Sequence, residues 1–136
     1  WVDGGYRTVQ DTERLTGVTP VIATETFIEW EQAGDMSKAV ISVDTREGRL
    51  LSARKDLTQG AILRIARAAG ARRFIHLRLD AVGGGLFDSS ALVAPGPGEE
   101  WYAGGGVRGR GDMAALETAG YKGALVSTAL HQGTLP

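Results

Sequence analysis

Short apolar runs alternate with amphipathic stretches along this chain, and that alternation constrains its fold more than any other feature. The runs are continuous rather than alternating in polarity, which is typical of strands buried on both faces of a parallel sheet. A strand–helix–strand order predicts an α/β fold with right-handed crossovers. The expected strands are Trp1-Val2, Val21-Ile22-Ala23, Ala39-Val40-Ile41-Ser42-Val43, Phe74-Ile75-His76-Leu77, Trp101-Tyr102-Ala103 and Ala124-Leu125-Val126.

Helices are expected between these runs. The clearest spans Leu57 to Ala69, where apolar residues recur at every fourth position and Gly70 supplies a C-terminal stop. A shorter helix is expected from Asp112 to Ala119, and weaker patterns cover Thr12–Thr16 and Thr26–Gln32.

Two glycine turns mark an internal repeat, residues 1–30 and 101–133. Glycine accounts for 20 of the 136 residues, roughly twice its average share of about 7%. Each copy reads strand, Gly-Gly-x-Arg, helix, strand, then a small residue and Thr. The matched residues are Gly4, Gly5, Arg7, Ala23 and Thr24 in the first copy and Gly105, Gly106, Arg108, Ser127 and Thr128 in the second.

The repeated pattern has the chemistry of anion binding. A Gly-Gly turn lets backbone N–H groups approach a ligand without side chains in the way, and helix N-termini add unpaired N–H groups and a positive dipole end. Two copies predict two phosphates on one ligand. The alternative is that the glycines only make tight turns, and that Arg7 and Arg108 form salt bridges with the following helices rather than contacts with phosphate.

Composition excludes several other classes of protein. A formal net charge of −1 gives no global basic field, which disfavours a nucleic-acid partner. No apolar run approaches the length of about 18 residues that a membrane span needs. There is no Cys, which excludes disulfides, thiolate metal sites and a Cys nucleophile, and the two His leave little support for a metal site. Cytoplasm is the default location, and residues 1–136 are expected to form one domain.

Asp44 is the candidate catalytic residue. It stands where the third apolar run gives way to the polar segment Thr45-Arg46-Glu47-Gly48. In a β/α barrel active sites lie at such strand ends, and a carboxylate there can act as general acid or base. The alternative is an Asp that caps a turn or pairs with Arg46.

Other polar residues have weaker claims. Asp3 precedes the first glycine pair and either binds a sugar hydroxyl or takes part in the turn. His76 lies inside an apolar run and is interpreted as a core histidine rather than a catalyst. Further candidates are Arg78 and Asp80 as substrate contacts and His131 as a surface residue.

The ordered set of motifs resembles the phosphoribosylformimino-aminoimidazole-carboxamide ribotide isomerase family of histidine biosynthesis and its sister cyclase. The resemblance covers almost the whole chain. Val40 to Gly48 resembles the family's fifth strand. The other matching segments are Val2–Arg7 and Val21–Thr24, which resemble the third and fourth strands, and Tyr102–Arg108 through Gly123–Gly133, which resemble the seventh and eighth.

The resemblance implies a (β/α)8 barrel of the ribulose-phosphate-binding type, of which this chain carries about six β/α units. It implies an Amadori-type aminoaldose–aminoketose isomerisation of a phosphorylated ribotide, two phosphate sites and no cofactor. Asp44 takes the place of the family's fifth-strand acid, and the first-strand acid has no position here. Six units leave two open sheet edges, to be covered by a missing N-terminal segment or by another copy of the chain.

Two departures from the family pattern keep an alternative open. The segment Leu50–Thr58 lacks the Trp that the family carries after its fifth strand, and Ile75–Gly85 lacks the Asp-Gly-Thr turn of the sixth. The alternative is a divergent relative, for example one associated with methanopterin-type cofactor synthesis. Such a relative binds a phosphorylated ligand without this isomerase activity.

Overall fold

One curved sheet of parallel strands organises the molecule. The computed structural model describes residues 1–78, 92–105 and 110–125. The parallel strands follow one another across the sheet in chain order, and a short β3 (Arg49–Leu50) pairs antiparallel with β2. An order that never reverses is that of a β/α barrel, since a doubly wound sheet switches direction in its middle. The parallel strands are β1 (Val21–Ala23), β2 (Val40–Arg46), β4 (Arg73–Arg78), β5 (Glu100–Gly104) and β6 (Gly123–Leu125).

These strands confirm the predicted apolar runs, with one exception. Val2 makes only an isolated parallel bridge with Pro20 instead of a strand. Its N–H donates to the Thr19 carbonyl, and the Val21 N–H donates to the Val2 carbonyl, at 2.9 and 2.8 Å. The chain turns away at the following glycines, so pairing stops after one residue.

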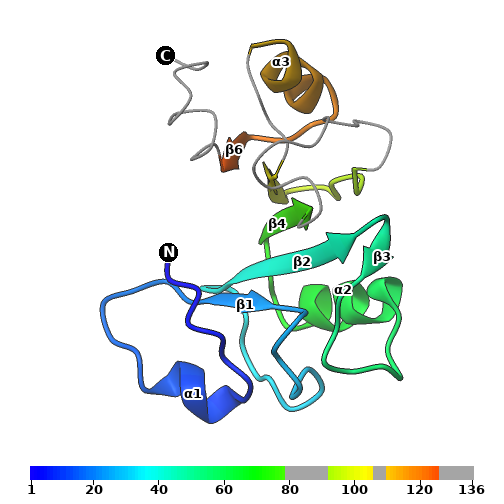
Figure 1. The fold of residues 1–136 in the computed structure, drawn as a ribbon. Helices are drawn as coiled ribbons and strands as arrows, with labels where there is room; N and C mark the ends of the chain where they lie inside the picture. The colour runs from blue at the N-terminus through cyan, green and yellow to red at the C-terminus, as the bar shows by residue number, and fades with distance from the viewer. Residues whose placement is uncertain (79–91, 106–109, 126–136) are drawn as a thin grey trace.

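The helices are α1 (Val9–Glu13), α2 (Gln59–Ala68) and α3 (Arg110–Thr118). The predictions for α2 and α3 are confirmed to within two residues at each end, and α1 begins three residues before the predicted start at Thr12. Figure 1 shows α1 and α3 at opposite ends of the molecule. None of the helices in the described ranges is long and apolar enough to cross a membrane.

The helix predicted over Thr26–Gln32 is wrong, because the chain there forms turns. The Thr26 and Phe27 N–H groups both donate to the Ala23 carbonyl, but the Ile28 N–H donates to Arg7, twenty-one residues away, at 2.9 Å. A helix would need that N–H to bond four residues back. The tertiary contact with Arg7 therefore replaces the helical ladder, while Phe27 and Trp30 are buried in the core.

The two faces of the sheet carry different cores. The outer face presents Ile41, Phe74 and Trp101 to α2, α3 and the turns after β1, and these residues form the main hydrophobic cluster. Phe74 and Trp101 stack with ring centroids 4.7 Å apart. The inner face has a smaller cluster, with Val21, Val40 and Ile75 buried at its centre.

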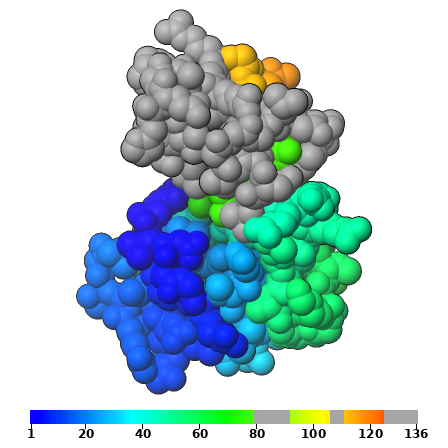
Figure 2. Space-filling view, viewed as in Figure 1, coloured from blue at the N-terminus to red at the C-terminus, as the bar shows by residue number. Residues whose placement is uncertain are grey.

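Trp1 shows that the sheet curls. Its chain segment pairs beside β1, at one edge, yet its ring meets that of Tyr102 on β5 edge-on, with centroids 5.1 Å apart. Two strands, β2 and β4, lie between β1 and β5. The ring can span them only if the inner face is concave, as in a segment of a barrel wall. The space-filling view shows the N-terminal segment in dark blue at the molecular surface (Figure 2).

Glycine ends the two longer helices. Gly70 has φ of 98°, its N–H donates to the Arg67 carbonyl, and the Ala71 N–H donates to the Ala66 carbonyl, at 3.1 and 3.0 Å. This pair of bonds is a Schellman motif, which confirms the predicted stop. Gly120 ends α3 in the same way, with φ of 89°.

Replacing Gly70 with Ala is expected to destabilise the fold by about 1–2 kcal/mol, because an L residue is strained at this positive φ. The added Cβ would make only ordinary contacts, 3.5 Å from Asp35 Oδ1 and from Ser37 Cβ, so the cost comes from the backbone. The measurement is urea-induced unfolding followed by circular dichroism.

The matched control is Gly60→Ala in the first turn of α2, where the nearest atom to a new Cβ is Thr58 Oγ1 at 4.0 Å. This change is expected to stabilise the protein by roughly 0.5–1 kcal/mol, because Ala loses less conformational entropy in a helix. Equal effects of the two substitutions would contradict the assignment of Gly70 as a conformational cap.

Candidate functional site

Asp44 lies near the carboxyl end of β2 on the inner face of the sheet. Side chains alternate along a strand, so Ser42 and Asp44 share the inner face while Val43 points outward. The Asp44 side chain is buried, with 2% of the residue exposed. The polar segment after it is not a loop: β2 continues to Arg46 and turns back into β3 as a hairpin. The predicted position of Asp44 on a sheet strand is confirmed, and the hairpin is new.

The carboxylate of Asp44 is held by two donors. The Ser42 hydroxyl donates to Oδ1 at 2.7 Å, and the Glu25 backbone N–H donates to Oδ2 at 3.2 Å. No ion pair joins Asp44 to Arg46 in the part of the chain that the structure describes. Neither alternative given for Asp44, a turn cap or a pair with Arg46, describes this geometry.

Burial, and to a smaller extent the nearby carboxylates of Glu25 and Asp3, raise the pKa of Asp44 from 3.8 to about 6. The hydrogen bonds from Ser42 and Glu25 act in the opposite direction because they stabilise the ionised form. A carboxyl with a pKa of about 6 exchanges protons readily near neutral pH, as a general acid–base catalyst must.

Thr24 fixes the backbone beside Asp44. Its hydroxyl donates to the Leu51 carbonyl at 2.8 Å and accepts from the Asp44 N–H at 3.0 Å. Its carbonyl accepts from the Ala53 N–H at 3.0 Å. The side chain is fully buried, so it joins β1, β2 and the segment after β3. A contact of Ala23 or Thr24 with phosphate stays a prediction, and the helix N-terminus expected to assist it is absent.

Arg54 is a structural residue that the sequence analysis missed. Its guanidinium forms paired hydrogen bonds to the carboxylates of Glu31 and Asp56, at 2.6–2.9 Å, and donates to the Ile28 carbonyl at 2.8 Å. These bonds clamp the turns after β1 to the segment after β3, which are the two segments that Thr24 also joins. The partners lie up to twenty-six residues away, so local spacing carries no signal for them.

The first glycine turn is closed by its own neighbours. Gly5 has φ of 65°, and its N–H donates to the Asp3 carboxylate at 3.2 Å. A Cβ at Gly4 would lie 2.8 Å from Tyr6 Cε1, so Gly4 allows the close approach of that buried ring. Asp3 therefore takes part in the turn, one of its two predicted roles.

Arg7 contacts the following helix through its backbone. Its N–H donates to Asp11 Oδ2 at 3.0 Å, and Thr8 and Asp11 form a capping box at the start of α1. The Arg7 residue is exposed. The predicted salt bridge between its guanidinium and the helix is not formed with any described residue. Phosphate binding by Gly4, Gly5 and Arg7 stays a prediction.

Only part of the second glycine turn can be compared with the first. Gly105 follows β5 directly and has φ of 86°, in the same left-handed region as Gly5. The two turns lie on either side of β2 in the strand order, with Asp44 on the strand between them. The remaining predicted residues lie outside the described ranges; they are Asp80, Gly106, Arg108, Ser127, Thr128 and His131.

His76 lies on the outer face of β4, away from Asp44. It is 4% exposed, its Nε2 is 3.3 Å from Thr45 Oγ1, and its Nδ1 has no hydrogen-bond partner. Burial lowers the pKa of His76 to about 4, so the ring is neutral at physiological pH. The burial of His76 agrees with the interpretation as a core histidine, but the expectation that its ring is fully hydrogen-bonded is wrong for Nδ1. Arg78 ends the same strand and is half-buried.

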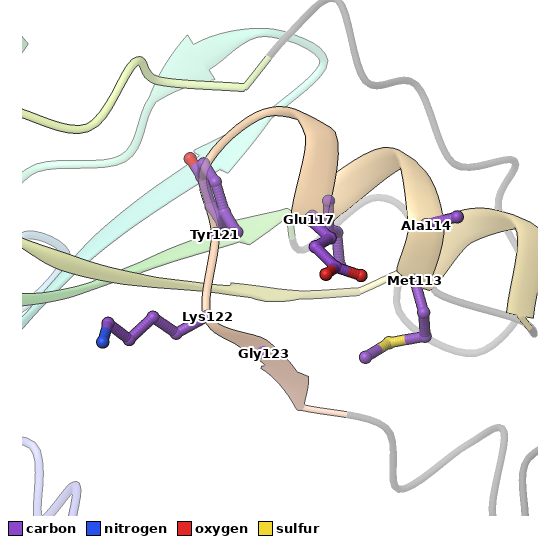
Figure 3. A pocket seen from close by; sticks show the side chains of 7 residues that line it. Met113, Ala114, Glu117, Tyr121, Lys122 and Gly123 are labelled. Atoms are coloured by element: carbon purple, nitrogen blue, oxygen red, sulfur yellow. The ribbon is translucent and has the colours of Figure 1, made fainter.

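Two hollows differ in their relation to Asp44. A cavity of about 200 Å³ lies on the inner face, lined by Asp3 and Ser42 together with the apolar side chains of Trp1, Val21, Ile75 and Leu77. A groove of about 560 Å³ lies against α3 and β6, where Figure 3 shows Met113, Glu117 and Tyr121 among its lining residues. The smaller cavity adjoins the candidate site, since Asp3 and Ser42 both act on Asp44.

No group of three or more His, Asp or Glu side chains suited to a metal ion occurs among the described residues. The carboxylates of Asp3 and Glu25 near Asp44 form an acidic centre. In the described part of the site, the groups near Asp44 that are able to move a proton or bind a ligand include the side chains of Ser42, Asp3 and Glu25 and backbone N–H groups.

Comparison with known families agrees with this arrangement. The family model described as "Histidine biosynthesis protein" matches residues 1–136. No curated protein matches the chain. The resemblance found in the sequence is thereby confirmed, and so is the barrel class, to which the curved parallel sheet in chain order belongs.

Asp44→Asn is expected to change how stability depends on pH. Because the pKa of Asp44 is raised to about 6 in the folded state from 3.8, the native state binds more protons in this interval. Its contribution to stability is fully present below about pH 4 and is lost as pH rises through about 6. The free energy of unfolding of wild type, relative to Asp44→Asn, should therefore fall by up to about 3 kcal/mol over that range. Urea unfolding at several pH values measures it.

The comparison with the variant is needed because His76 makes the free energy of unfolding change with pH in the opposite direction to Asp44. Its lowered pKa, about 4, makes stability rise as pH rises from about 4 to about 6.5, and this effect cancels in the difference. Ser42→Ala, which removes a bond to the ionised carboxylate, should move the Asp44 transition to higher pH. A difference that does not vary with pH would refute the raised pKa of Asp44.

Proposed function

The chain belongs to the histidine biosynthesis protein family, and we propose that it forms part of a phosphoribosyl-ligand-binding barrel that catalyses an aminoaldose–aminoketose isomerisation. The observation that carries the proposal is the buried Asp44 carboxyl, on the inner face near the carboxyl end of β2. Active sites of β/α barrels lie at this end of the strands. The substrate is a phosphorylated ribotide, and no cofactor is required.

The reaction needs a group that takes a proton from carbon. In an Amadori-type rearrangement the ring-opened imine, protonated on nitrogen, loses a proton from the hydroxyl-bearing carbon beside the imine carbon, and the double bond shifts to give a neutral enaminol. The enaminol becomes the ketone when the former imine carbon gains a proton and the enol hydroxyl loses one. Asp44, with a pKa of about 6, is mostly ionised at neutral pH and is assigned the removal of the first proton.

The surroundings of Asp44 suit this role. The Ser42 hydroxyl and the Glu25 N–H fix both carboxylate oxygens, and the Thr24 hydroxyl fixes the backbone of the same residue. A base held in one orientation loses little entropy on reaching the reactive geometry. The phosphates are assigned to the two glycine turns, which follow elements on either side of β2 in the strand order.

A specific observation favours a second candidate. The segment Leu50–Thr58 carries no Trp, and in the structure this segment serves to clamp the turns after β1 through Arg54. A relative that binds a phosphorylated ligand without this isomerisation fits that replacement. Turnover separates the two candidates, because both predict binding and only the first predicts chemistry.

Asp44→Asn is expected to lower kcat for the family's ribotide substrate by roughly a hundredfold or more, the usual contribution of a general base, while substrate binding is kept. The measurements are a spectrophotometric turnover assay and isothermal titration calorimetry. Asp35→Asn is the matched control, because Asp35 is an exposed carboxylate that accepts a hydrogen bond from the Ser37 N–H in a loop. Binding without turnover in the wild-type protein would favour the second candidate.

Asp3→Asn is expected to strengthen phosphate binding at the first glycine turn several-fold. The Asp3 carboxylate accepts the Gly5 N–H at 3.2 Å, so an incoming phosphate meets both a competitor and a like charge. The amide oxygen of Asn can still accept this hydrogen bond, so the turn is expected to persist. Calorimetric titration with inorganic phosphate measures the affinity, with Asp35→Asn again as control. Unchanged affinity in Asp3→Asn would argue against a phosphate at Gly5.

A further inference from the structure

We propose that Arg46 and Arg49, which face each other across the β2–β3 hairpin, form an anion-binding site at the rim of the Asp44 site. The site takes a phosphate or phosphate-monoester group. The proposal deepens the proposed function and rests on it for the nature of the ligand, because it adds the hairpin to the two glycine turns as a contact for an anionic end of the substrate.

The register places both arginines on one side of the sheet. Arg46 and Arg49 are Cα partners in the antiparallel pair of β2 and β3, and directly opposite residues of such a pair project from the same face. Arg46 is two residues beyond Asp44, so the two share the inner face of β2. Two residues of strand advance by about 6.6 Å, a spacing comparable to the reach of a small phosphorylated sugar.

The hairpin that carries the arginines has a defined turn. Glu47 and Gly48, its two connecting residues, have φ of 51° and 76°. Positive φ at both positions is the type I′ geometry, whose twist matches that of the flanking strands. The turn therefore holds the two guanidinium-bearing strands in register. Figure 1 shows the hairpin at the edge of the molecule, and its residues from Arg46 to Arg49 are exposed.

Placing Arg46 opposite Arg49 destabilises the hairpin, and a bound anion would remove that repulsion. Like charges directly opposite each other in a sheet are destabilising, and neither guanidinium is in an ion pair with any described residue. Two other arginines are neutralised in the described part of the chain: Arg54 is bonded to two carboxylates, and Arg67 to Glu99. Two arginines with planar, paired N–H donors are the preferred partners of a phosphate.

The charges around Asp44 are complementary to such a ligand. Asp3 and Glu25 add negative charge beside Asp44, which disfavours an anion there and favours the hydroxyls or amine of a substrate's middle. The hairpin lies farther along β2 and supplies positive charge beyond this acidic centre. A ligand with an anionic end on the hairpin thus has its neutral part directed toward Asp44.

The experiment is a calorimetric titration of the protein with inorganic phosphate, repeated with ribose 5-phosphate. Arg46→Gln and Arg49→Gln are each expected to weaken binding several-fold, and the double variant roughly tenfold or more. Arg64→Gln is the matched control, since Arg64 is an exposed arginine on α2, and is expected to leave binding unchanged. Arg46→Lys keeps the charge and loses the paired donors, so its loss should lie between wild type and Arg46→Gln.

Thermal unfolding of the same variants checks the fold. The double variant is expected to melt at or above the wild-type temperature, because the repulsion between the arginines is gone. A folded double variant that binds phosphate as tightly as wild type overturns the proposal, as does a wild-type protein that binds no phosphate. Isomerase turnover with binding independent of the arginines leaves the proposed function standing and refutes this site. Arginine-dependent binding without turnover supports the site and refutes the isomerase.

Discussion

The hydrogen bonds of the Thr24 hydroxyl hold together the elements on which the candidate site depends. One oxygen atom donates to the segment after β3 and accepts from β2, while the backbone of the same residue continues β1. A fully buried hydroxyl that lost either partner would leave an unsatisfied polar group, at a cost of about 1–3 kcal/mol. The geometry of Asp44 and the register of the β2–β3 hairpin are therefore linked through a single side chain, which Arg54 supports from the surface.

The same arrangement explains how a carboxylate can be buried here. Taking an ionised group out of water is costly unless hydrogen bonds replace the lost solvation. From the described residues Asp44 receives two such bonds, and the charged groups among them that act on it are the carboxylates of Glu25 and Asp3. The loss of solvation therefore outweighs the two hydrogen bonds, and the pKa of Asp44 is raised. A buried carboxylate with a structural role is stabilised in its ionised form by more donors. Glu99, for example, accepts hydrogen bonds from Arg67, Trp101 and Gly96. Asp44 is left responsive to protons, on the inner face beside the cavity that Asp3 and Ser42 line.

Sequence patterns predicted the parts of the fold that depend on local periodicity. Continuous apolar runs located β1, β2, β4, β5 and β6, and the stripe ending at Gly70 located α2. The patterns failed where a distant contact decides the backbone. The Ile28 N–H bonds to Arg7 and prevents a helix. The hairpin after Asp44 was missed, although Glu47-Gly48 followed by two residues of strand is a short signal for it. Of the site, Asp44 could be predicted from its place at the end of an apolar run, whereas the Thr24 side-chain bonds and the bonds of Arg54 to Ile28 and Glu31 span twenty residues or more.

The glycine turns show how one sequence motif can satisfy a structural need before a functional one. Gly4 admits the Tyr6 ring, and the Gly5 N–H is already bonded to Asp3. An anion at this turn must displace the Asp3 carboxylate, which lies only two residues away in the sequence and therefore loses little conformational entropy when it binds the Gly5 N–H. The hairpin arginines face the reverse situation, since their mutual repulsion falls when an anion arrives. If a ligand with two anionic ends occupies the inner face near Asp44, electrostatics assigns its first contact to the hairpin and makes the glycine turn the weaker end until Asp3 is moved aside. The order of binding then follows from charge, and the reactive middle of the ligand reaches the acidic centre only after one end is held.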